Sequence, residues 1–290
     1  MHNSFNSIFE ARKGRKSRAT DAVIWSRNLL LTFRIMSISV LMMVLLHSSF
    51  VLTPLQYYRH LTEWGLTITL VTFMVLVMNS FSKSNNFHVM RKNTNKSVAS
   101  VMNAVTGGKS RMQSEYENTI MDRVCVICFE TAFTSEFLIT LIFWVVLTPG
   151  GITRRIQKGS KLHQELPDLT SSVLVYWTEV HSFPMLLLLI DLIFNKILFS
   201  KTHVLFPLLY CCAFLFSEVL FTSYTGVPAY FIATWDNFES YFFAIISGVI
   251  LFFAFYIGLW IGRIKNHPNF NYHTERIMGK IVERTPRSYK

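Results

Sequence analysis

Charged residues are scarce in this sequence. They make up 16% of its 290 residues, whereas about 25% is usual in a soluble domain. Hydrophobic residues make up 51%, and phenylalanine alone occurs 26 times. The low charge excludes an ordinary soluble domain and predicts an integral membrane protein.

Cysteine is also sparse, which excludes a disulfide-rich secreted domain. The four cysteines all lie in apolar runs: Cys125, Cys128, Cys211 and Cys212. The spacing of Cys125 and Cys128 is half of a zinc site, but no second pair follows. We therefore predict buried thiols, and neither a metal nor any other cofactor.

Acidic residues are outnumbered, 17 against 28 lysines and arginines, and the formal net charge is +11. The basic residues lie in the tails and loops between apolar runs. Membrane orientation and anionic lipid headgroups account for that placement. We predict contact between the basic tails and such headgroups, and no nucleic-acid partner.

Six apolar runs are long enough to cross a membrane. They predict an all-α, six-helix transmembrane bundle with spans at about 35–52, 61–81, 124–147, 173–199, 204–224 and 241–262. The membrane domain covers residues 29–262, between basic tails at 1–28 and 263–290. The segments predicted on one side, both tails included, hold 22 lysines and arginines against 5 on the other side. This bias supports an even number of spans and places both termini on the cytoplasmic side.

Two polar segments carry their own predictions. The N-terminal tail places Phe5, Ile8 and Phe9 at helical spacing before a basic run, which indicates an amphipathic segment on anionic lipid. The long loop at 82–123 is rich in Ser, Asn and Lys, which predicts a flexible segment.

Polar residues at membrane depth usually face the bundle interior and are the first functional candidates. The exception that we predict is Arg34, whose long side chain lies near a basic membrane face and is expected to extend to the headgroups. In the fourth span, helical spacing puts six residues on one inward stripe: Trp177, His181, Pro184, Leu188, Asp191 and Asn195. A histidine beside a proline kink has room for a substrate, or it can simply hydrogen-bond a neighbouring helix. A pair of haem ligands, His47 and His181, also stays open.

Four stretches, in order along residues 57–232, resemble the androgen-induced gene and rolling-stone-like family of multispan membrane proteins. They are Tyr58-Arg59-His60-Leu61-Thr62-Glu63-Trp64, Phe143-Trp144, His181 with Pro184 and the aliphatic run to Asp191, and Tyr224-Thr225-Gly226-Val227-Pro228-Ala229-Tyr230. Some members of that family hydrolyse fatty acid esters of hydroxy fatty acids with a threonine and a histidine. The resemblance implies Thr62 as nucleophile and His181 as base, with Glu63, Glu179 and Asp191 as supporting polar residues. It leaves open whether Glu179 or Asp191 orients the imidazole.

Two other functions remain open. One is a non-catalytic accessory or structural subunit that packs against partner membrane proteins; the other, which has less support, is a transporter that uses the buried carboxylates. Discontinuous helices would favour transport, but Pro184 is the only visible break. We expect an endoplasmic reticulum or plasma membrane protein, with the mitochondrial inner membrane as the alternative.

Overall fold

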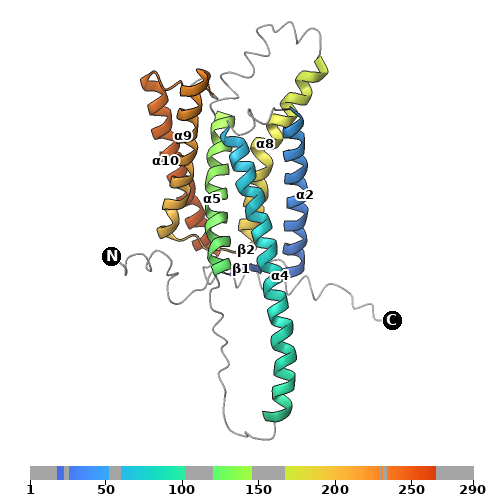
Figure 1. Ribbon diagram of the computed structural model, residues 1–290. Helices are drawn as coiled ribbons and strands as arrows, with labels where there is room; N and C mark the ends of the chain where they lie inside the picture. The colour runs from blue at the N-terminus through green and yellow to red at the C-terminus, as the bar shows by residue number, and fades with distance from the viewer. Residues whose placement is uncertain are drawn as a thin grey trace.

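The computed structural model describes residues 18–22, 26–51, 60–101, 120–145, 167–228, 230 and 234–265. They form the predicted all-α bundle, with one short strand pair at one end (Figure 1). The helices are α2 (Arg27–Val51), α4 (Leu61–Val101), α5 (Ile120–Ile142), α8 (Pro167–Phe194), α9 (Leu205–Thr225) and α10 (Phe238–Lys265). The strands are β1 (Arg18–Ala22) and β2 (Asn195–Lys196), and a 3-10 turn, η2 (Lys201–Val204), precedes α9.

Each of the six helices contains a stretch long and apolar enough to cross a membrane. These spans are Arg27–Ser49, Leu61–Ser82, Ile120–Val145, Tyr176–Phe194, Lys201–Thr225 and Phe238–Lys265. The chain is therefore an integral membrane protein, and its described part holds the predicted six candidate spans. Most edges differ from the prediction by a few residues, and two differ most: the first span begins earlier, at Arg27, and the fourth ends earlier, at Phe194.

Helix α5 lies at the centre of the bundle. It packs against α4 and α8 on one side and against α9 and α10 on the other, while α2 packs against α4 and α8 (Figure 1). Because α5 is enclosed, Thr131, Thr134 and Ser135 are buried there alongside Phe129 and Phe133. The outer helices instead turn large apolar side chains outward, as a lipid-facing surface requires.

Small residues set the closest helix approaches. A Cβ atom on Gly65 of α4 would stand 2.7 Å from the Glu136 Oε1 atom of α5 and closer still to Ile139. Gly226 has a different role, because it ends α9 with a left-handed φ of 69° and donates its N–H to the Thr222 carbonyl at 2.8 Å.

The first and last described segments lie at the same end of the bundle. Strand β1 pairs antiparallel with β2, which follows α8 directly. Lys265, the last residue of α10, reaches the same place and donates to the Ile197 carbonyl at 3.4 Å. An even number of membrane crossings between β1 and Lys265 accounts for this arrangement.

The prediction of a flexible loop at 82–123 is wrong for the first half of that segment. Helix α4 continues without a break to Val101 and projects beyond the bundle (Figure 1). Ser, Asn and Lys tolerate a solvated helix, so polar composition alone did not distinguish the two cases. Three segments lie outside the described residues: 102–119, the amphipathic segment predicted within 1–17, and the basic tail from 266 onward.

Candidate functional site

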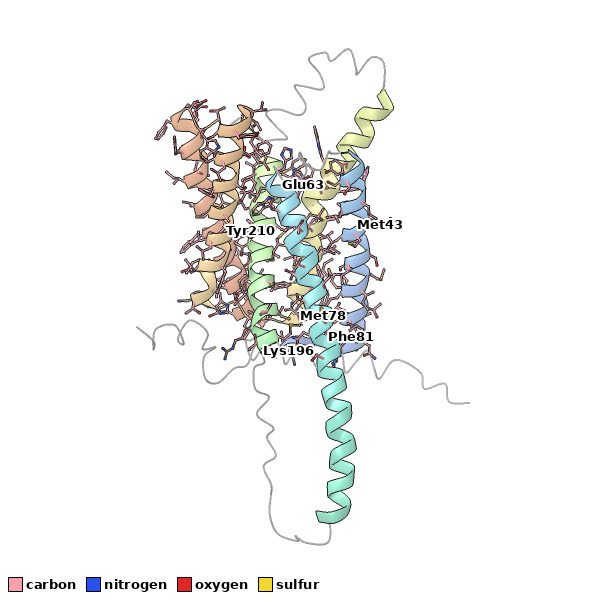
Figure 2. The ribbon with its side chains drawn as sticks, in the orientation of Figure 1. Met43, Glu63, Met78, Phe81, Lys196 and Tyr210 are labelled. Carbon is pink, nitrogen blue, oxygen red and sulfur yellow. The ribbon has the colours of Figure 1, made fainter. Side chains whose placement is uncertain are left out.

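Thr62 and His181 lie side by side at the end of the bundle opposite the strand pair. The Thr62 Oγ1 atom is 3.4 Å from the His181 Nε2 atom. Thr62 is the second residue of α4, and His181 lies near the middle of α8, so the pair bridges two neighbouring helices. The adjacent Glu63 marks this level of the bundle, far from Lys196 at the other end (Figure 2).

Tyr230 fixes the start of α4. The first backbone N–H groups of a helix have no partner within it, and the N–H of Leu61 donates to the Tyr230 hydroxyl at 2.9 Å. Burial raises the pKa of this phenol, which therefore stays protonated, and the Thr62 side chain also contacts it. Tyr230 thus holds the turn that carries Thr62.

Helix α5 and the turn that follows it position His181. The Phe143 ring packs against the imidazole with a centroid separation of 3.9 Å. The Thr140 hydroxyl donates to the His181 carbonyl at 2.7 Å, three residues before Pro184 interrupts the helical hydrogen bonding. The His181 Nδ1 atom is buried, and no described residue hydrogen-bonds to it.

An apolar pocket opens beside the pair. It encloses about 610 Å³ when the open space at its mouth is included, and its interior is narrow. Helices α4, α5, α8, α9 and α10 all contribute to its wall. Most lining side chains are apolar, including Leu61, Leu138, Ile142, Phe214 and Phe243; the polar ones are Thr62, His181, Glu218, Ser247, Tyr230 and Trp235. Such a pocket suits an acyl chain that carries one polar group.

Neither carboxylate suggested for the imidazole contacts it. Glu179 pairs with His47, whose Nδ1 atom is 3.6 Å from its Oε2 atom. Asp191 is ten residues further along α8, or about 15 Å at the helical rise per residue. Neither therefore orients His181 in this arrangement, because both carboxylates pair with side chains of α2: Glu179 with His47 and Asp191 with Arg34.

Glu63 belongs to a separate polar group. Its Oε1 atom accepts a hydrogen bond from the Tyr176 hydroxyl at 3.5 Å, and that hydroxyl lies 2.8 Å from the Ser48 Oγ atom. Glu63 therefore links α4 to α8 and α2, and it does not contact His181 in this arrangement. Its other oxygen, Oε2, is buried with no hydrogen-bond partner among the described residues.

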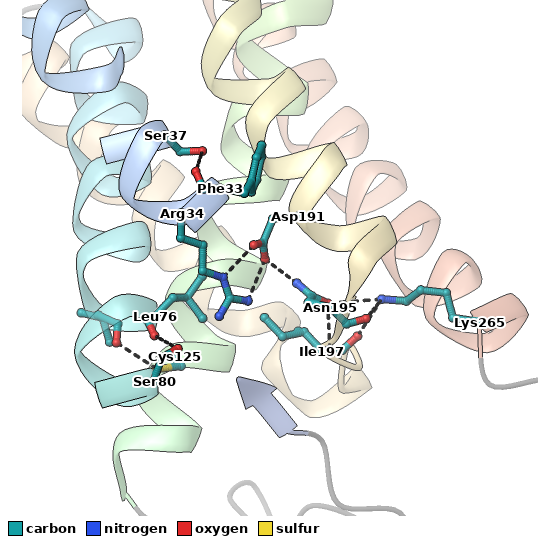
Figure 3. Close-up of polar contacts among 11 residues, drawn as sticks. Phe33, Arg34, Ser37, Leu76, Ser80, Cys125, Asp191, Asn195, Ile197 and Lys265 are labelled. Carbon is teal, nitrogen blue, oxygen red and sulfur yellow. Dashed lines mark hydrogen bonds and ion pairs between the residues drawn. The ribbon is translucent and has the colours of Figure 1, made fainter. Parts of the chain in front are cut away.

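Asp191 forms an ion pair at the opposite end of the bundle (Figure 3). The Arg34 Nε and Nη2 atoms donate to its two oxygens at 2.7 and 3.1 Å. Asn195 donates to the same carboxylate at 2.6 Å. Arg34 is 1% exposed, so the prediction that its side chain extends to the headgroups is wrong. A bidentate carboxylate partner on α8 makes the buried position tolerable.

Lys265 joins this group from α10, although its position suggested a solvated tail. Its ammonium donates to the carbonyl of Asn195 at 3.0 Å and to that of Leu192. The last carbonyls of a helix need such donors. Lys265 therefore caps the C-terminal end of α8.

Trp235, like Ser247, is a pocket residue that sequence reasoning missed. It lies in the segment between α9 and α10, which has no helical periodicity to reveal which side chains turn inward. Its one recognisable signal is a tryptophan directly before Asp236 and Asn237, two residues that often precede a helix.

The structure shows no metal site in the part of the chain that it describes. Among those residues, no three His, Cys, Asp or Glu side chains are grouped to hold an ion.

Comparison of the chain with family models, with curated proteins and with solved structures found no match.

Proposed function

We propose that this membrane protein is a lipid-ester hydrolase in which Thr62 is the nucleophile and His181 the general base. The observation that carries the proposal is the 3.4 Å contact between Thr62 Oγ1 and His181 Nε2 on the wall of an apolar pocket. Catalytic hydrogen bonds are often long before substrate binds. The resemblance of four ordered stretches to the androgen-induced gene and rolling-stone-like family supports the same assignment.

The chemistry begins with proton transfer. His181 Nε2 takes the Thr62 hydroxyl proton as Oγ1 attacks the ester carbonyl carbon and forms a tetrahedral intermediate. The carbon–oxygen bond to the leaving alcohol then breaks, and His181 returns the proton to that alcohol. Water, activated by the same nitrogen, hydrolyses the acyl-threonine, releases the fatty acid and restores the hydroxyl. Because no described carboxylate contacts Nδ1, the two residues act as a dyad.

The apolar wall supports a substrate with a long acyl chain. Burying each methylene contributes about 0.8 kcal/mol, and a lipid already in the bilayer reaches the pocket without crossing water. The pair lies near the start of α4. The positive charge bias places the end with the strand pair, the basic end, in the cytoplasm. Thr62 and His181 then lie in the opposite leaflet.

The first prediction tests the pair directly. We expect Thr62→Ala and His181→Ala each to reduce hydrolysis of a long-chain fluorogenic ester in nanodiscs to background, because the nucleophile and its base act as a unit. The double variant should be no worse than either single one. Thr67→Ala is the matched control, because this α4 threonine is exposed and bonds only the Glu63 carbonyl of its own helix, at 2.7 Å.

A fluorophosphonate probe gives a second readout. It should attach to the unmodified chain and to Thr67→Ala, and not to Thr62→Ala. Full hydrolysis by folded Thr62→Ala would contradict the assignment of Thr62 as nucleophile, whereas no hydrolysis by the unmodified chain would favour a non-catalytic subunit.

A further inference from the structure

Trp235 has a backbone conformation that few residues adopt. Its φ is 65°, the only positive value among the described residues other than glycine. A residue with a bulky side chain is strained in this conformation, which persists only where neighbouring contacts hold the backbone in place.

The first turn of α10 enforces the conformation. The backbone N–H of Trp235 donates to the Ser240 Oγ atom at 3.0 Å, and the Tyr241 hydroxyl donates to the Trp235 carbonyl at 3.3 Å. Ser240 is itself held by Asn237, whose side-chain oxygen accepts its N–H at 3.2 Å. The Tyr241 ring packs edge-on against the indole, with centroids 6.0 Å apart. Both backbone groups and one face of the ring are therefore fixed.

The result is an indole in the pocket wall with its donor unused. Trp235 lines the same pocket as Thr62 and His181. Its Nε1 atom is buried, and no described residue accepts a hydrogen bond from it. A buried donor without an acceptor is rare in folded proteins and calls for an explanation. An indole N–H can only donate, so the missing partner must be an acceptor.

We propose that the indole N–H of Trp235 donates a hydrogen bond to the carbonyl oxygen of the bound lipid. This proposal deepens the proposed hydrolase and rests on it for the reaction, although binding of a carbonyl lipid does not require hydrolysis. In this mostly apolar pocket, the carbonyl is the strong acceptor that an acyl lipid brings. Attack by Thr62 places negative charge on that oxygen, and a fixed donor stabilises the charge more in a dry site than in water.

The donor also defines a ligand class. Lipids with a carbonyl group, such as esters and long-chain ketones, satisfy the indole. Alkanes of equal length leave it unpaired, which penalises their binding. The pocket should therefore prefer a long-chain ketone to the alkane of matched length.

A ketone that cannot be hydrolysed separates binding from catalysis. The probe is a long-chain methyl ketone with a ¹³C-labelled carbonyl, added to the full chain in detergent and followed by infrared spectroscopy. We expect its carbonyl band to move to lower wavenumber on binding to the unmodified protein. The shift should persist in Thr62→Ala and in Trp260→Phe, a matched control on the exposed side of α10. It should disappear in Trp235→Phe, which keeps an aromatic ring without the donor.

Hydrolysis gives the second readout. Loss of an oxyanion donor typically costs ~10²–10³-fold in kcat, so Trp235→Phe should lose about that much while Trp260→Phe keeps full activity. A carbonyl shift that remains in Trp235→Phe overturns the inference, as does failure of the ketone to bind. A Trp235-dependent shift without hydrolysis by the unmodified protein overturns only the proposed hydrolase, and leaves Trp235 as a carbonyl-binding residue.

A spectroscopic test covers the case in which Trp235→Phe does not fold. The chain has six tryptophans, and ¹⁵N-indole labelling gives each its own N–H resonance. On ketone addition, the Trp235 resonance, assigned by replacing the other tryptophans one at a time, should move downfield. An unmoved Trp235 resonance in the presence of bound ketone overturns the inference.

Discussion

The ion pair of Arg34 and Asp191 shows how single residues decide stability in this bundle. The two charges are almost fully buried, and the guanidinium meets the carboxylate through two hydrogen bonds. A buried pair repays its desolvation only when its geometry is good. Removing one partner leaves the other charge uncompensated, which costs more than the pair contributes.

The second prediction follows from this asymmetry. Arg34→Met alone should lower the free energy of unfolding by about 3–5 kcal/mol, because Asp191 then remains charged and buried. Arg34→Met combined with Asp191→Asn should recover most of the loss, since the amide still accepts the hydrogen bond from Asn195. Unfolding in mixed micelles measures both. Arg263→Met, at an exposed site on α10, should change little; a double variant as unstable as the single one would show that the charge itself is not the cause.

At the scale of the helix, Gly65 brings α4 against α5 where the candidate site begins. The missing Cβ leaves room for the Glu136 carboxylate and for Ile139. Of these two residues, Ile139 also lines the pocket. The helix approach and the shape of the pocket therefore depend on the same small residue.

The third prediction compares two glycines. Gly65→Ala should destabilise the bundle by about 1–3 kcal/mol through overpacking, and it should lower ester hydrolysis because Thr62 lies on the displaced turn. Gly248→Ala meets nothing within 4 Å and should be neutral or stabilising by up to ~1 kcal/mol. Thermal unfolding and activity, measured on both variants, test the contrast. Equal effects of the two substitutions would mean that helix contact at Gly65 is not the cause.

The helices show what the sequence could and could not predict. Apolar runs of sufficient length predicted six spans, because a membrane demands them regardless of partners. The same rule misplaced the end of the fourth span, since Ile197 and Phe199 are buried and apolar although the chain has left the helix. Hydropathy indicates burial and does not indicate where a helix ends. The helix can end here because Lys265, 70 residues after Asn195, donates hydrogen bonds to the carbonyl groups at its end.

The candidate site, too, has features that the sequence could predict and features that it could not. Thr62 and His181 were expected together from the resemblance, and their chemical types were visible in the sequence. Their separation depends on Tyr230, Phe143 and Gly65, which act through tertiary contacts that no local pattern encodes. Trp235 was missed because its role depends on one backbone torsion angle in a segment between helices.

At the scale of the whole molecule, the bundle has one end with the strand pair and Lys265 and another with the candidate site. The fourth prediction tests this sidedness with single cysteines in a chain that lacks its four native ones. Cysteines at Lys201 and Arg263, both exposed at the basic end, should react with an impermeant maleimide from the same side of sealed vesicles. A cysteine at Val227, just past the end of α9, should react from the other side. Labelling of positions 201 and 227 from one side would mean that α9 does not cross.

The ion pair also has a consequence for the time course of synthesis. Asp191 follows Arg34 by 157 residues, which at ribosomal rates of ~5–20 residues per second amounts to roughly 8–30 s. Throughout that interval the first span carries a guanidinium whose carboxylate does not yet exist. Lys265 is later still, so the C-terminal carbonyls of α8 wait for the last residue of α10. The membrane domain therefore reaches its final set of contacts only after the last of its six helices, α10, has been made.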